Sequence, residues 1–259
     1  MRSPCFWSAD QLTFLPRIIK ELLQTSDPQI KALKETYALL PETRCRRNTR
    51  CCSMLPEMTL VESLLVIRRL VEMSAAVRNP LIKKIIGYFF LNPVEIISCP
   101  FLEGQDCLIY PDRFFGCRSY GLWSRAYYEK LAARDRKAKR YLQEQWKDLS
   151  VCLPNKIVDF KVSYCPWVET IRPKAIDDRT LLKVSDRIQA ISAHFSSRHQ
   201  WFARRYFSDL SFLLSALMFG YTEAVQLKFT IVRDMVHSEN RTKLDRILKK
   251  LPDLCAELT

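Results

Sequence analysis

Glycine and histidine are scarce in this chain, which has five glycines and three histidines among 259 residues. The glycine content lies well below the usual share of about 7%. This scarcity argues against folds that repeat glycine-dependent turns, such as barrels and nucleotide-binding α/β folds. The sequence contains no G-x-G-x-x-G and no G-x-x-x-x-G-K-[ST]. A glycine-rich loop that cradles phosphate is therefore not expected.

Sequence motifs of two hydrolase classes are also absent. The chain has no G-x-S-x-G turn for a serine nucleophile and no H-E-x-x-H pair for zinc. His194, His199 and His237 all fall within helical patterns, and the first two are five residues apart, a poor spacing for one helix face. We expect all three to be ordinary helix residues.

Long uncharged apolar runs are missing as well. A membrane-spanning helix needs roughly 18 apolar residues, and the nearest candidate, LSFLLSALMFGYT at 210–222, is flanked by Asp209 and Glu223. We expect it to be a buried helix. The first residues, MRSPCFWSADQLTF, are interrupted by Asp10 and lack the small-residue cleavage site of a signal peptide. The sequence thus predicts no transmembrane segment and a cytoplasmic location.

The charge is strongly positive, with 41 Lys and Arg against 28 Asp and Glu and a net charge of +13. Such a balance favours an anionic partner, such as nucleic acid or an acidic protein. The alternative is a basic solvated surface without a dedicated partner. The sequence identifies no small-molecule substrate and no oligomeric state.

Apolar residues spaced three and four apart predict a mainly α fold. The predicted helices cover 10–24, 29–40, 59–77, 79–91, 124–149, 177–206, 207–220 and 222–250. Thr59 is the expected N-cap of the third helix, with Glu62 completing a capping box, and Pro80 is expected in the first turn of the fourth. Residues 92–122 are predicted to be an ordered loop with a short extended piece at CLIY, and residues 156–164 a strand or extended link.

We expect this helical scaffold to carry irregular cysteine-rich metal-binding loops. Residues 1–123 would form a helical cysteine-cluster domain, and residues 124–259 a basic helical region, either separate or part of the same domain.

The helix at 124–149 mixes basic and aromatic side chains: Arg125, Lys130, Arg134, Arg136, Lys137, Lys139 and Arg140 with Tyr127, Tyr128, Tyr141 and Trp146. That mixture is found in nucleic-acid-binding proteins, but also in a solvated helix whose aromatic residues face the core.

Cysteine is the residue type that carries the functional signal, with ten in the chain. In a cytosolic protein cysteines indicate metal binding, catalysis or core packing more often than disulfides. Two loops, ETRCRRNTRCCSMLPEMT and CPFLEGQDCLIYPDRFFGCRSYG, hold Cys45, Cys51, Cys52, Cys99, Cys107 and Cys117. Thiolates are soft ligands suited to zinc, copper(I) and iron–sulfur clusters. We expect these six to converge on one metal site.

The two loops together resemble the YkgJ-like cysteine-cluster family, a zinc- or iron-chelating family. Its first motif is C-x2-C-x2-C-C, matched at Cys45, Cys51 and Cys52, but Asn48 stands at the second position. Its second motif is matched by CPFL, CLIYPDR and CRSY, with Phe114 in place of the proline that follows Arg113. The resemblance covers about residues 40–122. It implies a metal held by the six cysteines.

Six thiolates exceed the four ligands of one tetrahedral zinc, and a [4Fe–4S] cluster uses four cysteines. We therefore favour an iron–sulfur cluster, with zinc as the alternative. Because Cys51 and Cys52 are neighbours, we expect them to bind different irons, or one of them to be structural. Arg113 and Arg118 are expected beside the site, where they would offset thiolate charge; a surface ion pair or a carbonyl contact within the loop is their alternative.

The remaining cysteines are weaker candidates. Cys165 in YCPWVE is a further ligand candidate from the C-terminal half, ahead of Cys152, whereas Cys5 and Cys255 are expected to be free or partly buried thiols.

The function expected from these features is metal binding, with a structural, electron-transfer or metal-handling role. A more distant resemblance to flagellin lysine-N-methylases implies an alternative, an S-adenosylmethionine-dependent lysine methyltransferase. A basic nucleic-acid-binding protein with a structural metal is the third hypothesis.

Overall fold

The computed structural model describes residues 14–44, 48–171, 176–254 and 258. Over these residues the protein is mainly helical, as the sequence predicts. The α-helices are α1 (Phe14–Thr25), α2 (Asp27–Tyr37), α3 (Leu60–Glu72), α4 (Ala75–Leu91), α5 (Phe115–Arg118), α6 (Arg125–Asp148), α7 (Asn155–Val158), α8 (Asp178–Ala193), α9 (Ser197–Tyr206), α10 (Leu210–Phe219), α11 (Tyr221–Ser238) and α12 (Thr242–Lys249).

Short irregular elements lie between these helices. There are two 3-10 turns in the described part of the chain, η2 (Arg50–Ser53) and η3 (Tyr110–Asp112). Strand β1 (Thr43–Arg44) pairs antiparallel with β4 (Glu169–Thr170). Strand β2 (Leu102–Glu103) pairs antiparallel with β3 (Asp106–Cys107). The first of these pairings joins segments that are far apart in the sequence.

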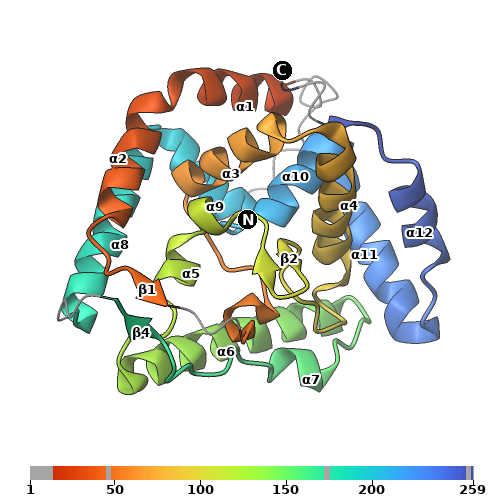
Figure 1. Cartoon of the computed structure of the whole chain (residues 1–259). Coiled ribbons are helices and arrows are strands. Elements are labelled where there is room, and N and C mark those ends of the chain that lie inside the picture. The colour runs from red at the N-terminus through yellow and green to blue at the C-terminus, as the bar shows by residue number, and fades with distance from the viewer. Residues whose placement is uncertain (1–13, 45–47, 172–175, 255–257, 259) are drawn as a thin grey trace, which may run out of the picture.

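The long helices surround the irregular elements (Figure 1). Helix α4 packs against α10, α11 and α12, while α2 packs against α8 and α3. Helix α6 runs along the side of the molecule where β1 and β4 pair (Figure 1). Buried apolar side chains from Leu15 to Leu258 form one core cluster that includes residues on both sides of position 123. The proposed division at that position stays a prediction.

Aromatic rings fill the part of the core where α4, α9 and α10 meet. The ring of Phe89 stacks on Phe212 at 5.0 Å between centroids, and Tyr206 meets Phe212 edge-on at 5.2 Å. Phe89 and Tyr206 are almost fully buried. Large buried rings contribute strongly to the free energy of folding, so this contact holds the scaffold around the irregular elements.

The start of α3 is confirmed and its end is not. Helix α3 follows the N-cap Thr59, and the capping box with Glu62 is present. The helix ends at Glu72, however, and a new helix begins at Ala75 behind Ser74. Pro80 therefore lies inside α4 and not in its first turn. There it removes one hydrogen bond, the one that an N–H at position 80 would donate to the carbonyl of residue 76.

Of the two alternatives predicted for residues 156–164, a strand or an extended link, the strand is wrong. Residues 155–158 form the short helix α7, and residues 159–168 have no regular structure. Two tyrosine hydroxyls, from Tyr120 and Tyr128, donate hydrogen bonds to the carbonyls of Ser163 and Val162. Side chains thus satisfy backbone groups that a strand ladder would otherwise pair.

The predicted C-terminal helices are present but divided. The range 177–206 is split into α8 and α9 at Ser196, where φ is +56°. The range 222–250 is split into α11 and α12 near Glu239, where φ is +51°. A positive φ in these residues ends a right-handed helix.

The basic helix α6 has the predicted position, with Ser124 as its N-cap. Three of its aromatic residues are partly buried: Tyr127 stacks on Trp123, Trp146 stacks on Phe229, and the hydroxyl of Tyr128 donates to Val162. Tyr141 is 70% exposed. Most of the aromatic side chains therefore pack against the protein, as in the solvated-helix interpretation.

In the described residues, no single helix has the length and hydropathy of a membrane span. Helices α10 and α11 meet those criteria only as a pair, and they are bent by 110° at their junction. The expected buried helix at 210–222 is α10, whose residues Leu210 to Leu217 are all buried.

The aromatic contact between α4 and α10 gives a stability test. Replacing Phe89 by alanine should lower the free energy of unfolding by about 3–5 kcal/mol, because it leaves a cavity against Phe212. Tyr141→Ala, on the exposed face of α6, should change it by less than about 0.5 kcal/mol. Urea unfolding followed by circular dichroism measures both. Equal effects of the two substitutions would contradict the packing described here.

Candidate metal centre

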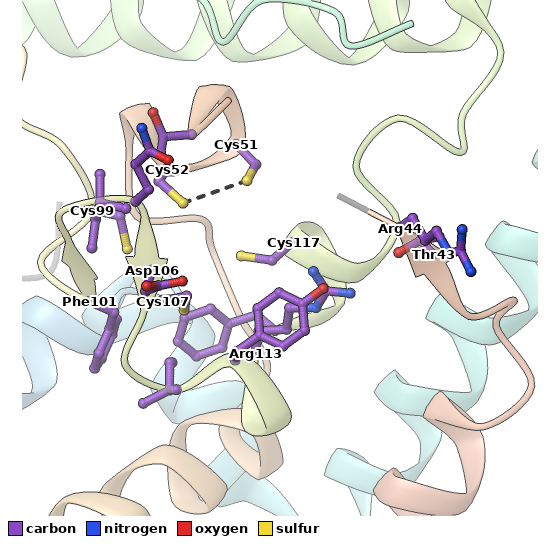
Figure 2. Close-up of a pocket in the computed structure, with 16 residues that line it drawn as sticks. Thr43, Arg44, Cys51, Cys52, Cys99, Phe101, Asp106, Cys107, Arg113 and Cys117 are labelled. Atoms are coloured by element: carbon purple, nitrogen blue, oxygen red, sulfur yellow. Dashed lines mark hydrogen bonds between the residues drawn. The ribbon is translucent and has the colours of Figure 1, made fainter. Parts of the chain in front are cut away.

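Five of the six predicted ligand cysteines line one cavity of about 560 Å³. They are Cys51, Cys52, Cys99, Cys107 and Cys117. Figure 2 shows these side chains on several sides of the same space, supplied by η2, by the β2–β3 hairpin with its preceding loop, and by α5. The structure therefore brings together cysteines that are up to 66 positions apart in the sequence.

The first cysteine pair is carried by the 3-10 turn η2. Thr49, at φ +55°, turns the chain into η2, and the hydroxyl of Ser53 donates to the carbonyl of Arg50 at 2.7 Å. The sulfur atoms of Cys51 and Cys52 lie 3.6 Å apart. Because the two cysteines are neighbours in the sequence, they were expected to bind different irons, or one of them to be structural. The tight turn places both sulfurs together at the cavity.

The second pair is carried by the β2–β3 hairpin and the loop before it. The backbone N–H of Cys99 donates to the carbonyl of Cys52 at 2.7 Å, which joins the two cysteine loops directly. Cys107 lies opposite Leu102 in the hairpin. Gly104 has φ +60° in the two-residue turn, a conformation that glycine adopts without steric cost. The extended piece expected at CLIY is limited to Cys107, because Tyr110 already begins a 3-10 turn.

The fifth thiol, that of Cys117, is positioned by a buried carboxylate from α3. Oε1 of Glu62 accepts hydrogen bonds from the N–H of Phe115 at 2.7 Å and from the hydroxyl of Tyr37 at 2.6 Å. Oε2 accepts from the N–H and hydroxyl of Thr59, at 2.8 and 2.9 Å. Because Phe115 begins the short helix that contains Cys117, this carboxylate ties the cysteine to α2 and α3.

Burial and mutual proximity raise the pKa values of four thiols of the cavity, those of Cys51, Cys99, Cys107 and Cys117. Burial, with smaller contributions from the charges of Cys51 and Cys107, raises the pKa of Cys117 to about 12. The hydrogen bond between Cys51 and Cys52, then burial, raises the pKa of Cys51. Burial likewise raises the pKa of Cys99 and of Cys107. A metal ion that is bound by these sulfurs as thiolates must displace their protons.

Arg113 is one of two arginines that line the cavity, with Arg44. Its charge lowers the pKa values of Cys51, Cys107 and Cys117 against the effect of burial. Its guanidinium carbon lies 4.2 Å from the centre of the Tyr110 ring. Within the described residues, its buried Nε has no hydrogen-bond acceptor. An anionic group in the cavity would supply one.

Arg118 makes its hydrogen bonds with the loop backbone. Its Nε donates to the carbonyl of Arg113 at 2.8 Å, and its terminal nitrogen donates to the carbonyl of Pro111. Its guanidinium also lies over the Tyr37 ring at 4.2 Å. Arg118 thus stabilises the loop through carbonyl contacts, which is the alternative that the sequence left open, and it is not among the residues that line the cavity.

The thiols surround the cavity but do not meet at one point. Among the described residues, no group of three or more His, Cys, Asp or Glu side chains is placed to hold one metal ion. A single tetrahedral zinc would need its sulfur ligands about 3.8 Å apart, for a zinc–sulfur bond of about 2.3 Å. The Cys51–Cys52 pair has a comparable separation, at 3.6 Å.

The other cysteines have different positions. Cys45, together with Cys5 and Cys255, lies outside the described residues. Cys152 is exposed and lines a separate surface hollow beside α6. Cys165 is buried, and its sulfur accepts a hydrogen bond from Asn48. No histidine is among the described residues that line the cysteine cavity.

Glu62 and the Asn48–Cys165 contact were missed as parts of the site. The capping-box pattern identified Glu62 as a helix-start residue, but its contacts with Tyr37 and Phe115 depend on packing between distant segments. The sequence suggested Cys165 as a candidate ligand but did not indicate which residue its sulfur contacts.

No protein-family model matches the chain, and neither the curated proteins nor the solved structures give a match. The assignment of the site therefore rests on the cavity and on the motif residues.

The buried carboxylate of Glu62 gives a test of how the site is held. In Glu62→Gln either orientation of the amide directs its NH₂ group at a backbone N–H, of Thr59 or of Phe115. We expect a loss of about 2–4 kcal/mol in the free energy of unfolding, together with faster alkylation of Cys117. Glu72→Gln, at the exposed end of the same helix, is the matched control and should leave both properties unchanged. Chemical unfolding and mass spectrometry after iodoacetamide treatment measure the two effects; wild-type values in Glu62→Gln would contradict this role.

Proposed function

We propose that this protein binds a [4Fe–4S] cluster through cysteine thiolates of the cavity, as a member of the YkgJ-like cysteine-cluster family. The observation that carries the proposal is the convergence of five cysteines on one cavity that Arg113 also lines. Structural cysteines in a core pack as isolated small apolar residues. Five around one space with a cationic neighbour are typical of a ligand set.

The spacing of the thiols favours a cluster over a single zinc ion. The cavity of about 560 Å³ is far larger than one ion requires, since even a water molecule occupies about 30 Å³. The irons of a cluster each take one thiolate, so its ligands stand around a volume and not around a point. The wide arrangement of these cysteines fits that requirement.

The charges of the site also suit an anionic cluster. Cys51 or Cys52, with Cys99, Cys107 and Cys117, would supply the four thiolates, and Cys45 remains a candidate outside the described residues. Arg113 would donate its free Nε–H toward the cluster and offset part of its negative charge. Such a cluster supplies one-electron transfer or a structural link between loops. A reducing compartment such as the cytoplasm would keep the ligands free of disulfides.

Metal and acid-labile sulfide analysis of protein purified without oxygen tests the proposal. We expect about four iron and four sulfide per chain with a broad visible absorption band. Cys107→Ala and Cys117→Ala should each lose most of the iron, whereas Cys152→Ala, at an exposed thiol away from the cavity, should retain it. About one zinc without sulfide would replace the cluster by a tetrahedral zinc site. Equal metal content in all variants would overturn the site.

A second candidate function is nucleic-acid binding, favoured by the exposed basic face of α6. Arg125, Lys130, Arg134 and Lys137 are all exposed there. We expect duplex DNA or RNA to bind with an affinity that falls steeply with salt, because phosphate contacts release counterions. Lys130→Glu with Lys137→Glu should weaken binding at least tenfold, while the control pair Arg246→Glu and Lys249→Glu on α12 should not. Fluorescence anisotropy at several salt concentrations measures the binding affinity. Binding that does not depend on salt would contradict a nucleic-acid-binding function.

A further inference from the structure

Cys165 is the one cysteine of the C-terminal half whose sulfur meets the first cysteine loop in the described structure. The side-chain amide of Asn48 donates from Nδ2 to Sγ of Cys165 at 3.6 Å. The orientation of this amide is set by its other end, since Oδ1 accepts from the backbone N–H of Arg50 at 3.3 Å. Arg50 begins η2, the turn that carries Cys51 and Cys52.

Backbone pairing holds the Cys165 segment along the first cysteine loop. In the β1–β4 ladder Thr43 lies opposite Thr170, and Arg44 lies opposite Glu169. The N–H of Ile171 donates to the carbonyl of Glu42 at 2.9 Å. Residues 169–171 therefore run beside residues 42–44, at the start of the first cysteine loop (Figure 1).

The second cysteine loop holds the same segment from its other side. The hydroxyl of Tyr120, three residues after Cys117, donates to the carbonyl of Ser163. Gly121 has φ +79°, and a Cβ atom there would lie 2.3 Å from the side chain of Val168 and 3.2 Å from the carbonyl oxygen of Cys165. The close approach requires glycine. Cys165 is thus fixed between both cysteine loops, with 3% of its surface exposed.

We infer that Cys165 is the fourth thiolate ligand of the metal centre, in place of Cys51 or Cys52, and that Asn48 donates a hydrogen bond to its sulfur. The inference rests on the proposed function. Asn48 stands at the position where the C-x2-C-x2-C-C pattern has a cysteine, and a cysteine from 117 positions further along the chain lies against it. The thiol missing from the first loop is supplied by the C-terminal half.

This assignment gives a function to residues 159–168, which form neither helix nor strand. The segment lacks regular structure, yet it carries a buried thiol to a fixed place between the two loops. A hydrogen bond donated to a ligand sulfur stabilises the thiolate and raises the reduction potential of an iron–sulfur cluster. Metal binding would then also fasten the C-terminal half to the cysteine loops.

The test compares iron content in Cys165→Ser with that in Cys152→Ser, both purified without oxygen. We expect Cys165→Ser to lose at least half of the iron of the wild type, and Cys152→Ser to retain it. The thermal midpoints of the metal-free forms should agree within a few degrees, which separates loss of a ligand from misfolding. Because Asn48 touches the sulfur, the double variant Asn48→Cys with Cys165→Ser should regain the iron.

The outcomes separate this inference from the proposed function. A wild-type protein without metal overturns the proposed function and this inference with it. A wild type with iron, and a Cys165→Ser variant with the same iron content and electron paramagnetic resonance spectrum, overturns only the role of Cys165.

If Cys165→Ser does not fold, the inference is tested with the variant Asn48→Ala instead. That variant keeps every thiol and removes the hydrogen bond to sulfur. We expect its reduction potential to be lower than that of the wild type, while Asn240→Ala, remote in sequence and ahead of α12, serves as the control with an unchanged potential. An Asn48→Ala potential equal to that of the wild type would overturn the inference.

Discussion

The carboxylate of Glu62 is the contact on which the arrangement of scaffold and cysteines depends. One buried side chain accepts hydrogen bonds from α2, from the start of α3 and from the start of α5. A buried carboxylate is costly unless all its acceptor positions are used, so these three segments are fixed relative to one another. Cys117 is carried on the last of them. The position of that thiol is therefore set by the helical core.

The irregular segments, by contrast, are held in place by contacts with one another. Cys99 bonds to Cys52 through the backbone, β1 pairs with β4, and Tyr120 reaches Ser163. These contacts bring thiols from several stretches of chain to the same region. The thiols with raised pKa values are neutral in the metal-free protein, and a metal group that replaced their protons would link the segments that carry them. The same contacts explain why a metal would stabilise loops that have little regular structure.

Much of the scaffold and the choice of cysteines could be predicted from the sequence. Apolar spacing located the helices, and the T-x-x-E pattern located the start of α3 at Thr59. The breaks near Ser196 and Glu239 were not predictable, because they depend on single residues with positive φ within helical patterns. Clustering around turns identified the five cysteines that line the cavity. The Asn48–Cys165 contact and the second role of Glu62 were missed, since both join segments whose proximity only the packed helices establish.

X-ray absorption spectroscopy at the iron edge, on protein purified without oxygen, tests the central claim most directly. The account predicts a first shell made of sulfur and a second shell of iron, as in a [4Fe–4S] cluster held by thiolates. An iron-free protein, or iron bound only by oxygen and nitrogen, would contradict the claim that these cysteines form a metal centre.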